Sequence, residues 1–301
     1  MTELSRISVK SSTRNDETNL TDPRVNYNSK PVIEGTSTPA VSARNVGLFV
    51  ETRKKLVRVL ADVTLEVLPG EFVGVLGPSG SGKTMFLNTI AGFENISQGE
   101  LTVLGSPPKA GRPDVGYGMA RDGLLPWRTA AENVELSLEA RGVGKKERHD
   151  RALEALRLVD LENFAGTYRA ELSQGMRQRV ALARTLVTNP SLLLLDEPFA
   201  ALDAQTRILM QERLLATLAS YSGTVFLVTH DVSEAIVLCD RVLIFTKRPA
   251  RVKAEFRIDF ERPRSAVELR SSRQFQEFHQ AIWQELAEEF KIISEARRAS
   301  V

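Results

Sequence analysis

An eight-residue stretch combines glycine, serine, lysine and threonine at the spacing of a phosphate-binding loop. It covers residues 77–84 and reads Gly77, Pro78, Ser79, Gly80, Ser81, Gly82, Lys83 and Thr84. This is the pattern G-x-x-x-x-G-K-[ST], in which the glycines let successive backbone N–H groups point at one anion. Lys83 can reach the β- and γ-phosphates of a nucleotide, and the Thr84 hydroxyl can ligate Mg²⁺. The stretch predicts binding of a nucleoside triphosphate with Mg²⁺.

Two adjacent carboxylates, Asp196 and Glu197, follow a run of four leucines at 192–195. Pro190 and Pro198 bound the run, which predicts a buried strand of a parallel sheet. Ligands bind at the carboxyl ends of such strands, so the pair belongs where a nucleotide binds. Asp196 is expected to join the Mg²⁺ shell through water, and Glu197 to act as general base on the attacking water. A merely structural pair is the less favoured alternative, because buried carboxylates are costly.

Three further residues are candidates by position. His230 ends a strand candidate at 224–229, so a phosphate-sensing role is favoured over a structural one. Ser173 stands where a helix N-cap belongs, and spacing alone favours a plain cap over an anion site with Gly175. Phe49 lies near the expected turn between two strand candidates, where purine stacking and core packing are equally favoured.

Apolar spacing predicts the elements that position these residues. Strands are expected on both sides of the glycine-rich loop, and helices are expected between 129 and 188. Leu124, Leu125 and Trp127 lie in a turn-rich segment and would be exposed unless something covers them. Such a patch marks either an interface or burial within the same domain, and the two are equally favoured. The expected strands cover residues 41–50, 56–67, 72–76, 99–104, 115–119, 192–195, 224–229 and 241–246.

Composition narrows the classes of protein. The 301 residues are 42% hydrophobic and 26% charged, with a net charge of +2, so there is no electrostatic footprint for nucleic acid. No apolar run approaches the roughly 18 residues of a membrane helix, and the N-terminus has no apolar signal-peptide core. Any membrane role is therefore expected through a partner. The single cysteine, Cys239, is expected to be buried packing.

The two ends of the chain differ in character. Residues 1–40 are rich in Ser, Thr, Asn and Pro and are expected to form a disordered tail. Residues 261–301 are expected to form a helical extension. Packing of that helix on its own domain is favoured over docking on another chain. Its apolar stripe consists of Phe275, Phe278, Ile282, Leu286 and Phe290.

The stretch 172–179, Leu-Ser-Gln-Gly-Met-Arg-Gln-Arg, resembles the signature motif of ATP-binding cassette (ABC) proteins. That resemblance implies an α/β, P-loop NTPase fold of the ABC ATPase type over residues 41–260. It comprises a parallel-sheet RecA-like core, an antiparallel β subdomain and a helical subdomain at about 120–185. The resemblance also implies the D-loop at Asp203, the switch histidine at His230 and the adenine-stacking aromatic at Phe49.

A narrower resemblance is to the nitrate/sulfonate/taurine branch of bacterial importers, carried by residues 123–127, 196–207 and 262–264. It implies an ATPase at the cytoplasmic face of the inner membrane, bound to a separate permease and served by an extracytoplasmic binding protein. Two cassettes would pair head to tail. Ser173, Gln174 and Gly175 would then bind the partner's ATP, and the apolar residues Leu124, Leu125 and Trp127 would contact the permease.

Two positions depart from the family pattern. Gln174 replaces a glycine of the signature, and Ala120 stands where the Q-loop glutamine belongs. The second departure favours one alternative, a weakly hydrolysing or degenerate cassette subunit paired with a different cassette. A soluble cassette acting on ribosomes or DNA is disfavoured, because the chain has one cassette and about a hundred residues between its two nucleotide motifs. The transported substrate, the pairing of cassettes and the role of the N-terminal tail stay open.

Overall fold

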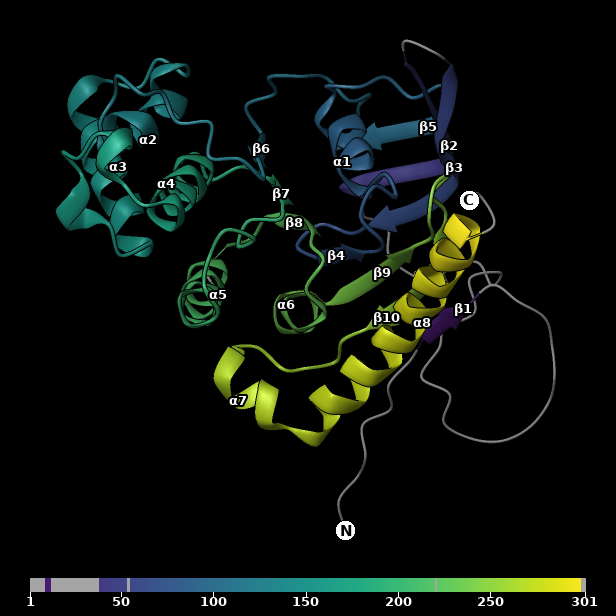
Figure 1. Ribbon diagram of the computed structural model, residues 1–301. Helices are drawn as coiled ribbons and strands as arrows, with labels where there is room; N and C mark the ends of the chain where they lie inside the picture. Colours follow the sequence, from purple (N-terminus) through teal and green to yellow (C-terminus); the bar gives the residue numbers. More distant parts are fainter. Residues whose placement is uncertain (1–8, 12–37, 53–54, 220, 299–301) are drawn as a thin grey trace. The chain divides into compact units, whose positions relative to one another are not determined.

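The computed structural model describes residues 9–11, 38–52, 55–219 and 221–298, and its chain divides into two compact units (Figure 1). The first unit comprises Met1–Ala110, Phe226–Glu261 and Glu268–Val301, and the second comprises Gly111–Val225 and Arg262–Val267. The predicted domain limits near residues 40 and 260 stay a prediction.

The main sheet of the first unit has the strand order β1-β10-β9-β4-β8. Strands β4 and β9 run parallel, and β10 lies antiparallel to β9. All five residues of β4 and of β8 are buried, as expected of strands covered on both faces. The strands are β1 (Val9–Ser11), β4 (Phe72–Leu76), β8 (Thr224–Val228, of which Phe226–Val228 belong to this unit), β9 (Arg241–Phe245) and β10 (Val252–Arg257).

A second sheet in the same unit is antiparallel, with the order β3-β2-β5. Its strands are β2 (Val41–Glu51), β3 (Leu56–Val67) and β5 (Gln98–Val103). β2 alternates buried and exposed residues at its start and is bulged further along, so its register against β3 shifts. Side chains of Val59 and Leu60 on β3 approach Gly82 of the glycine-rich loop, so this sheet lies against that loop.

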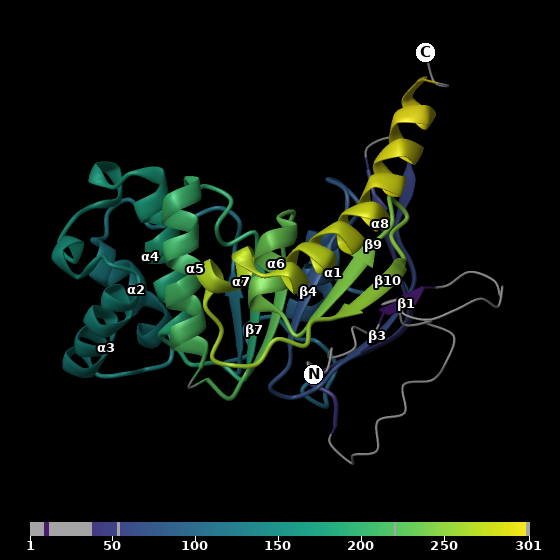
Figure 2. The same ribbon diagram turned by 90° about the horizontal axis from the view of Figure 1, so that it is seen from below.

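Helix α1 (Lys83–Ala91) packs its aromatic residue against the main sheet of the first unit. The ring of Phe86 lies 5.9 Å from that of Phe226 and 5.7 Å from that of Phe245, both tilted. α6 (Val232–Leu238) and α8 (Arg273–Arg298) pack against each other, and α8 runs along β9 and β10 (Figure 2). Cys239 is buried, as its apolar neighbours predicted.

The stripe predicted on the C-terminal helix packs within its own unit. Phe275, Phe278, Ile282 and Leu286 of α8 are buried, which confirms that prediction for four of its five residues. Phe290 is instead half-exposed, beside Trp283 on the outer side of the helix.

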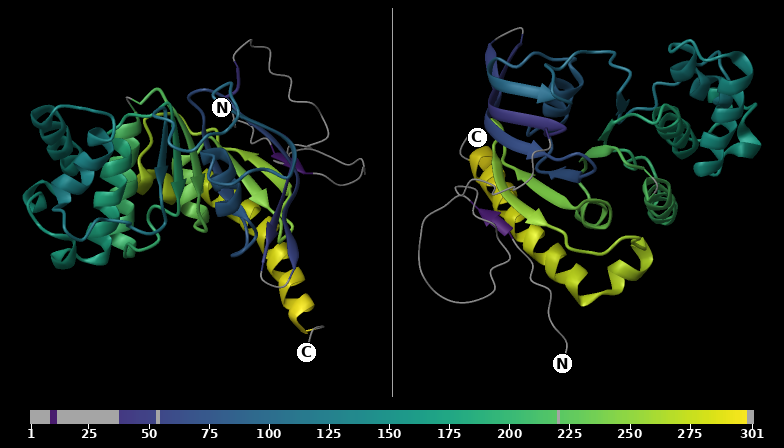
Figure 3. Two further views of the ribbon diagram at one scale, coloured as in Figure 1. Left: turned by 90° about the horizontal axis from the view of Figure 1, so that it is seen from above. Right: turned by 180° about the vertical axis from the view of Figure 1, so that it is seen from behind.

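The second unit joins a pair of parallel strands to a group of helices (Figure 3). All of β7, the four leucines and Asp196, is buried, as the sequence predicted. α2, α3 and α4 contact one another. The elements are β6 (Val115–Gly118), α2 (Ala130–Glu139), α3 (Lys145–Leu158), the 3₁₀ turns η1 (Glu162–Phe164) and η2 (Arg169–Glu171), α4 (Gln174–Leu186), β7 (Leu192–Asp196), α5 (Ala204–Leu218) and α7 (Ala266–Ser271, shared with the first unit).

The structure contains elements that the sequence did not predict. Strand β10 and helices α5 and α6 had no counterpart among the sequence predictions. Residues 9–11 form β1, which pairs antiparallel with β10, although they fall in the segment expected to be disordered. The rest of that prediction, at 1–8 and 12–37, lies outside the described residues.

Candidate nucleotide site

The glycine-rich loop joins β4 to α1 in the first unit, and two of its glycines are required by geometry. A Cβ at Gly77 would lie 2.7 Å from the carbonyl oxygen of Phe245. Gly82 has a φ of +125°, which side chains other than hydrogen rarely allow. Gly82 is also the N-cap of α1, so the N-terminus of this helix lies at the loop. This arrangement is suited to an anion.

The cation of the loop is buried within it. Lys83 is 7% exposed, and its Nζ donates to the carbonyl oxygens of Gly77 (2.8 Å) and Pro78 (3.0 Å). Ser81 is 1% exposed, and its Oγ has no hydrogen-bond partner among the described residues. Burial of a charge and of an unpaired hydroxyl is costly without a ligand. Phosphate oxygens would pair with both groups, so the loop fits the phosphates of a nucleotide.

His230 lies at the same edge of the main sheet as the loop. The backbone N–H of Thr229 donates to the carbonyl oxygen of Val75, two residues before the loop begins. The next residue, His230, is exposed, and Asp231 then caps α6. The predicted position at the carboxyl end of a strand is therefore found, and the phosphate-sensing role stays a prediction.

Phe49 lies inside β2 rather than in a turn, because β2 extends to Glu51. Placing it in the turn between the two strands was wrong. The ring is half-buried, and it faces a cation: Arg58, its cross-strand partner on β3, has its guanidinium carbon 5.6 Å from the ring centre. This is cation–π geometry. Stacking of adenine on Phe49 therefore requires Arg58 to share the ring or to move.

The carboxylates that follow β7 belong to the second unit. Asp196 is 5% exposed and ends the strand. Burial raises the pKa of the Tyr117 hydroxyl, and the negative charge of Asp196 raises it further, so the two side chains are neighbours. Thr84, the other predicted Mg²⁺ ligand, is exposed in the first turn of α1 in the first unit. Hydroxyl and carboxylate oxygens are the donor types that Mg²⁺ takes.

Glu197 adopts a backbone conformation that is uncommon for its residue type. Its φ is +48°, in the left-handed region. Its carbonyl oxygen accepts hydrogen bonds from Ala200 N (3.2 Å) and from the side-chain amide of Gln178 (3.2 Å). Such conformations persist where the surroundings enforce them, and they concentrate at functional sites. The same Gln178 amide lies 3.4 Å from the carbonyl oxygen of Ala120.

The signature residues open helix α4. Ser173 is the N-cap, and its Oγ accepts from Met176 N at 3.2 Å, which confirms the capping prediction. Gln174 and Gly175 form the first turn. A Cβ on Gly175 would lie 3.1 Å from the Leu202 side chain, so a larger residue would press on the segment before Asp203. The role of these residues toward a partner's ATP stays a prediction.

Asp203 also serves as an N-cap, for helix α5. Its carboxylate accepts from Thr206 N (2.9 Å) and from Thr206 Oγ1 (2.7 Å). The backbone and side-chain hydrogen bonds of Thr206 lower the pKa of Asp203, which therefore stays ionised at neutral pH. The structure thus gives this residue a capping role in addition to the D-loop role that the family resemblance implies.

The three apolar residues proposed to contact a permease have different exposures. Trp127 is 70% exposed and Leu125 is half-buried, but Leu124 is only 5% exposed. The alternative, burial within the same domain, therefore holds for Leu124, which cannot serve as a contact where it lies. The backbone N–H of Leu124 donates to Asp122 Oδ1 at 3.1 Å, so the backbone of this residue is also held within the unit.

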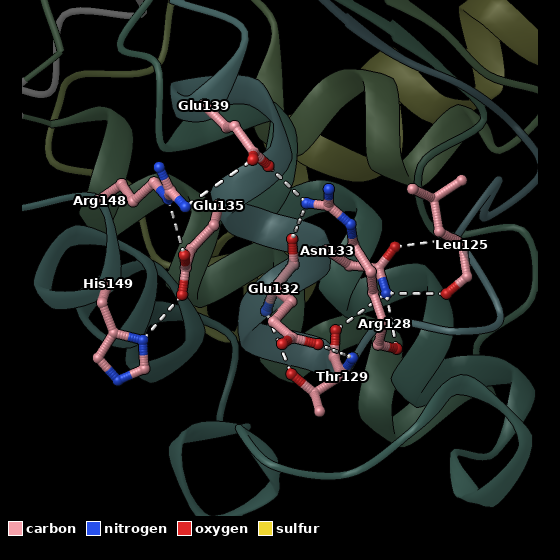
Figure 4. A network of polar contacts seen from close by, with 9 residues as sticks. All are labelled: Leu125, Arg128, Thr129, Glu132, Asn133, Glu135, Glu139, Arg148 and His149. Atoms are coloured by element: carbon pink, nitrogen blue, oxygen red, sulfur yellow. Dashed lines mark hydrogen bonds and ion pairs between the residues drawn. The ribbon is translucent and has the colours of Figure 1, made fainter. Parts of the chain in front are cut away.

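Asn133 on α2 holds the segment before Trp127 and the start of the helix (Figure 4). Its Oδ1 accepts from Leu125 N (2.7 Å), and its Nδ2 donates to the carbonyl oxygens of Leu125, Arg128 and Thr129. A cavity of about 660 Å³ opens beside Trp127, and Glu135, Arg148 and His149 are among its lining residues. The side chain of His149 is half-exposed, and its Nδ1 lies 2.8 Å from Glu135 Oε1.

Sequence reasoning missed the polar side chains that hold these segments. Gln178, Arg177 and Arg184 were seen only as part of a helix, and Asn133 and Asp122 were not singled out. Their signal is weak, because a glutamine or arginine on a helix is ordinarily solvated. A buried partner, which only the fold supplies, distinguishes them.

Comparison with known proteins identifies the family of the chain. Residues 60–200 match the ABC transporter family. An uncharacterized ABC transporter ATP-binding protein of Methanocaldococcus jannaschii is 42% identical over 249 residues, which is 83% of this chain and 92% of the relative. Taurine import ATP-binding protein TauB of Rhizobium johnstonii is 44% identical over 238 residues, covering 78% and 91%.

Solved structures give the same result for the fold. A dimeric, post-hydrolysis structure of the ATP-binding cassette MJ0796 bound to ADP and Pi superposes with a TM-score of 0.67 at 32% identity, and covers 73% of this chain and all of the other. A search of the helices among the described residues finds none that is both long and apolar enough to cross a membrane.

Proposed function

Since the chain belongs to the ATP-binding proteins of ABC transporters, we propose that it is the ATPase subunit of an importer that takes up a small anion or sulfonate through a separate permease. The chain is an ABC-type ATPase with a P-loop fold. Support for the importer branch comes from relatives named taurine import ATP-binding protein, which are 40–45% identical. A single observation in the structure carries the nucleotide role: buried Lys83 and unpartnered Ser81 Oγ lie together inside the glycine-rich loop.

The phosphates of ATP would be held by the backbone of residues 77–84 and by Lys83. Bound Mg²⁺, held by Thr84 and through water by Asp196, would neutralise phosphate charge. Glu197 would accept the proton of the attacking water, and His230 would contact the γ-phosphate. The left-handed backbone conformation of Glu197 sets the direction in which its side chain leaves the backbone. A defined direction suits a general base, which must be oriented toward the attacking water.

A second copy or a different cassette would complete the site. The ATP bound by the partner would meet the start of α4, at Ser173, Gln174 and Gly175. A helix N-terminus attracts anions, and the Ser173 hydroxyl could donate to a phosphate oxygen while it caps the helix. Trp127 would contact the permease, and the extracytoplasmic binding protein would deliver the substrate. With these contacts the subunit would lie at the cytoplasmic face of the membrane.

Ala120 supports one alternative, a weakly hydrolysing subunit paired with a different cassette. An alanine methyl group has no donor or acceptor for Mg²⁺ or water. The two functions differ in the rate of hydrolysis, since ATP binding is common to both.

Purification of the tagged chain from detergent-solubilised membranes tests the proposal. We expect an integral membrane protein to co-purify, and the complex, reconstituted with its binding protein, to hydrolyse ATP faster when taurine or another sulfonate is added. Nitrate and bicarbonate are the competing substrates in the same assay. The importer assignment is wrong if no membrane protein accompanies the chain.

A further inference from the structure

The carboxylate of Asp122 lies at the centre of a cluster of arginines in the second unit. Arg169 Nε donates to Oδ1 at 3.1 Å, and Arg177 Nε donates to Oδ2 at 3.1 Å. The side chain of Asp122 is largely buried. Burial acts to raise its pKa, but the Leu124 N–H and the two arginines outweigh this and hold the pKa below its usual range. Asp122 is therefore an anion at neutral pH, neutralised on two sides.

Most of the contacts come from a single helix, α4. Arg177 binds the Asp122 carboxylate, and Arg184 donates to the backbone carbonyl oxygens of Asp122 (2.8 Å) and Gly123 (2.9 Å). Gln178 reaches the carbonyl oxygen of Ala120. Three side chains of α4 thus fasten residues 120–123, and α4 is the helix that Ser173 caps.

The other end of the fastened segment leads to Trp127. Only three residues separate Gly123 from this exposed tryptophan, and Asn133 ties the intervening backbone to α2. Hydrogen bonds therefore hold the backbone between α4 and Trp127 on both sides. Charge-assisted hydrogen bonds from arginine to a carboxylate are the strongest of these links.

We propose that Asp122 is a positioning residue that couples Trp127 to the signature helix α4. Position 120, which carries no side-chain amide in this chain, contributes only its backbone carbonyl. Coupling therefore passes through the Asp122–Arg177 ion pair to Ser173 and Gly175, which open α4. This inference rests on the proposed function, since it takes Trp127 as the permease contact.

The first test compares ATP hydrolysis by the purified chain with and without its co-purified permease. Asp122→Asn and Arg177→Gln each remove the ion pair, and both should lower the permease-stimulated rate about tenfold, because small misplacements of catalytic groups cost one to two orders of magnitude. ATP affinity should change less than about twofold, since the loop around Lys83 belongs to the other unit. Asp122→Glu, which keeps the charge, should restore most of the stimulation.

Two control variants separate coupling from simple loss of an ion pair. Asp114→Asn breaks a comparable pair, Arg112–Asp114 at 2.6 Å, elsewhere in the same unit. Arg169→Gln removes the cation of the cluster that is not on α4. Both should leave the stimulated rate near the parent value. The inference is overturned if Asp122→Asn behaves like Asp114→Asn, or if rate and ATP affinity fall together.

A second test needs no permease and uses the two tryptophans of the chain, Trp127 and Trp283. With Trp283→Phe, Trp127 is the single indole and reports on its own segment. MgATP should change its fluorescence anisotropy in the parent and in Asp114→Asn, but not in Asp122→Asn. Thermal melting of each variant checks that the fold is retained, and Arg177→Gln, which removes the same ion pair, replaces Asp122→Asn if that variant does not fold.

The outcomes of the two tests are distinguishable. If no membrane protein co-purifies, the proposed function fails, and the anisotropy experiment still decides whether Asp122 links α4 to Trp127. If the complex forms but Asp122→Asn keeps both the stimulation and the MgATP response of Trp127, the inference fails and the function stands. An unresponsive Trp127 in the parent chain also overturns the inference.

Discussion

Lys83 is a basic side chain buried in a loop, where it donates to backbone carbonyl oxygens of that loop. The carbonyl oxygens replace part of the water that a lysine loses on burial, and the phosphates of a nucleotide would replace more of it. Ser81 and the N-terminus of α1 lie beside it, so three kinds of donor converge on one volume.

We expect Lys83→Ala to weaken ATP binding by about two orders of magnitude or more, because the phosphates lose the only side-chain cation of the loop. Equilibrium binding of a fluorescent ATP analogue measures this. Lys109→Ala changes a lysine outside the loop in the same unit and is the control. Unchanged affinity for Lys83→Ala would show that the loop does not bind phosphate.

A second prediction at this scale concerns Ala120. Restoring the amide with Ala120→Gln should raise the basal ATPase rate about tenfold, which corresponds to roughly 1.4 kcal/mol of barrier. The carbonyl of residue 120 keeps its bond to Gln178, so the backbone should not move. Steady-state hydrolysis measures the change, with Ala120→Leu as the control for side-chain size. A flat or lower rate would indicate that another group, such as Arg121, already fills the role.

At the scale of elements, Trp127 is an exposed aromatic residue on a segment, 120–128, whose backbone is held by hydrogen bonds. Asn133 and helix α4 fix the backbone on both sides, yet the Trp127 ring itself is in water. A large ring held rigidly in solvent loses little entropy on binding, which is why such residues recur at the centres of interfaces. Leu124, in contrast, stabilises the unit from inside.

Trp127→Asp should therefore release the chain from its membrane complex, because a charge buried at an apolar contact is costly. Co-purification with the permease at fixed salt is the measurement. Trp283→Asp changes the other, similarly exposed tryptophan and should leave the complex intact. Retention of Trp127→Asp in the complex would place the docking surface on another element.

One lysine of the sheet in the first unit pairs with three glutamates of helix α8. Lys253 on β10 lies 3.2 Å from Glu285, 2.7 Å from Glu288 and 3.7 Å from Glu289. Glu285 and Glu289 are themselves buried, and Glu289 also accepts from the backbone N–H of Lys247. Lys253 thus supplies positive charge to two buried carboxylates and one exposed carboxylate of the helix.

Lys253→Met should destabilise the protein by about 3 kcal/mol, the usual cost of leaving buried carboxylates without their cation. Thermal unfolding followed by circular dichroism measures the loss. Arg273→Met, which breaks the exposed pair with Glu277, is the control and should cost little. A loss for Lys253→Met no greater than the control's would show that water already compensates the glutamates.

At the scale of the whole molecule, the glycine-rich loop proposed to bind ATP and helix α4 belong to different units of one chain. Lys83, Thr84 and His230 belong to the first unit, and Glu197 and Ser173 to the second. A solved relative is a dimer that holds ADP and Pi. An assembly that contributes residues from both kinds of unit to one nucleotide would make dimer formation depend on ATP.

Glu197→Gln should keep ATP binding and stop hydrolysis, since an amide cannot accept a proton from water. An ATP-stabilised dimer should then accumulate, and light scattering on a sizing column measures its mass with ATP and with ADP. Glu212→Gln, a change on α5, is the control and should remain as the parent. Hydrolysis by Glu197→Gln near the parent rate would identify another base.

The sequence by itself determined the features that depend on local spacing. The order of glycines in residues 77–84 requires one backbone path, and four consecutive leucines before Asp196 cannot be solvated, so loop and strand are readable without a fold. The capping role of Ser173 and the apolar stripe of α8 follow from helical periodicity in the same way.

Tertiary structure alone decided which side chains are buried and what they meet. Leu124 and Trp127 are three residues apart and similar in character, but one is covered and the other is not. Phe49 meets Arg58 only because β2 and β3 pair in that register. Asp122 and Arg177 are 55 residues apart in the chain, and no local pattern links them. Burial and long-range pairing are properties of the folded chain, because residues that are distant in sequence become neighbours only when the chain packs around its core.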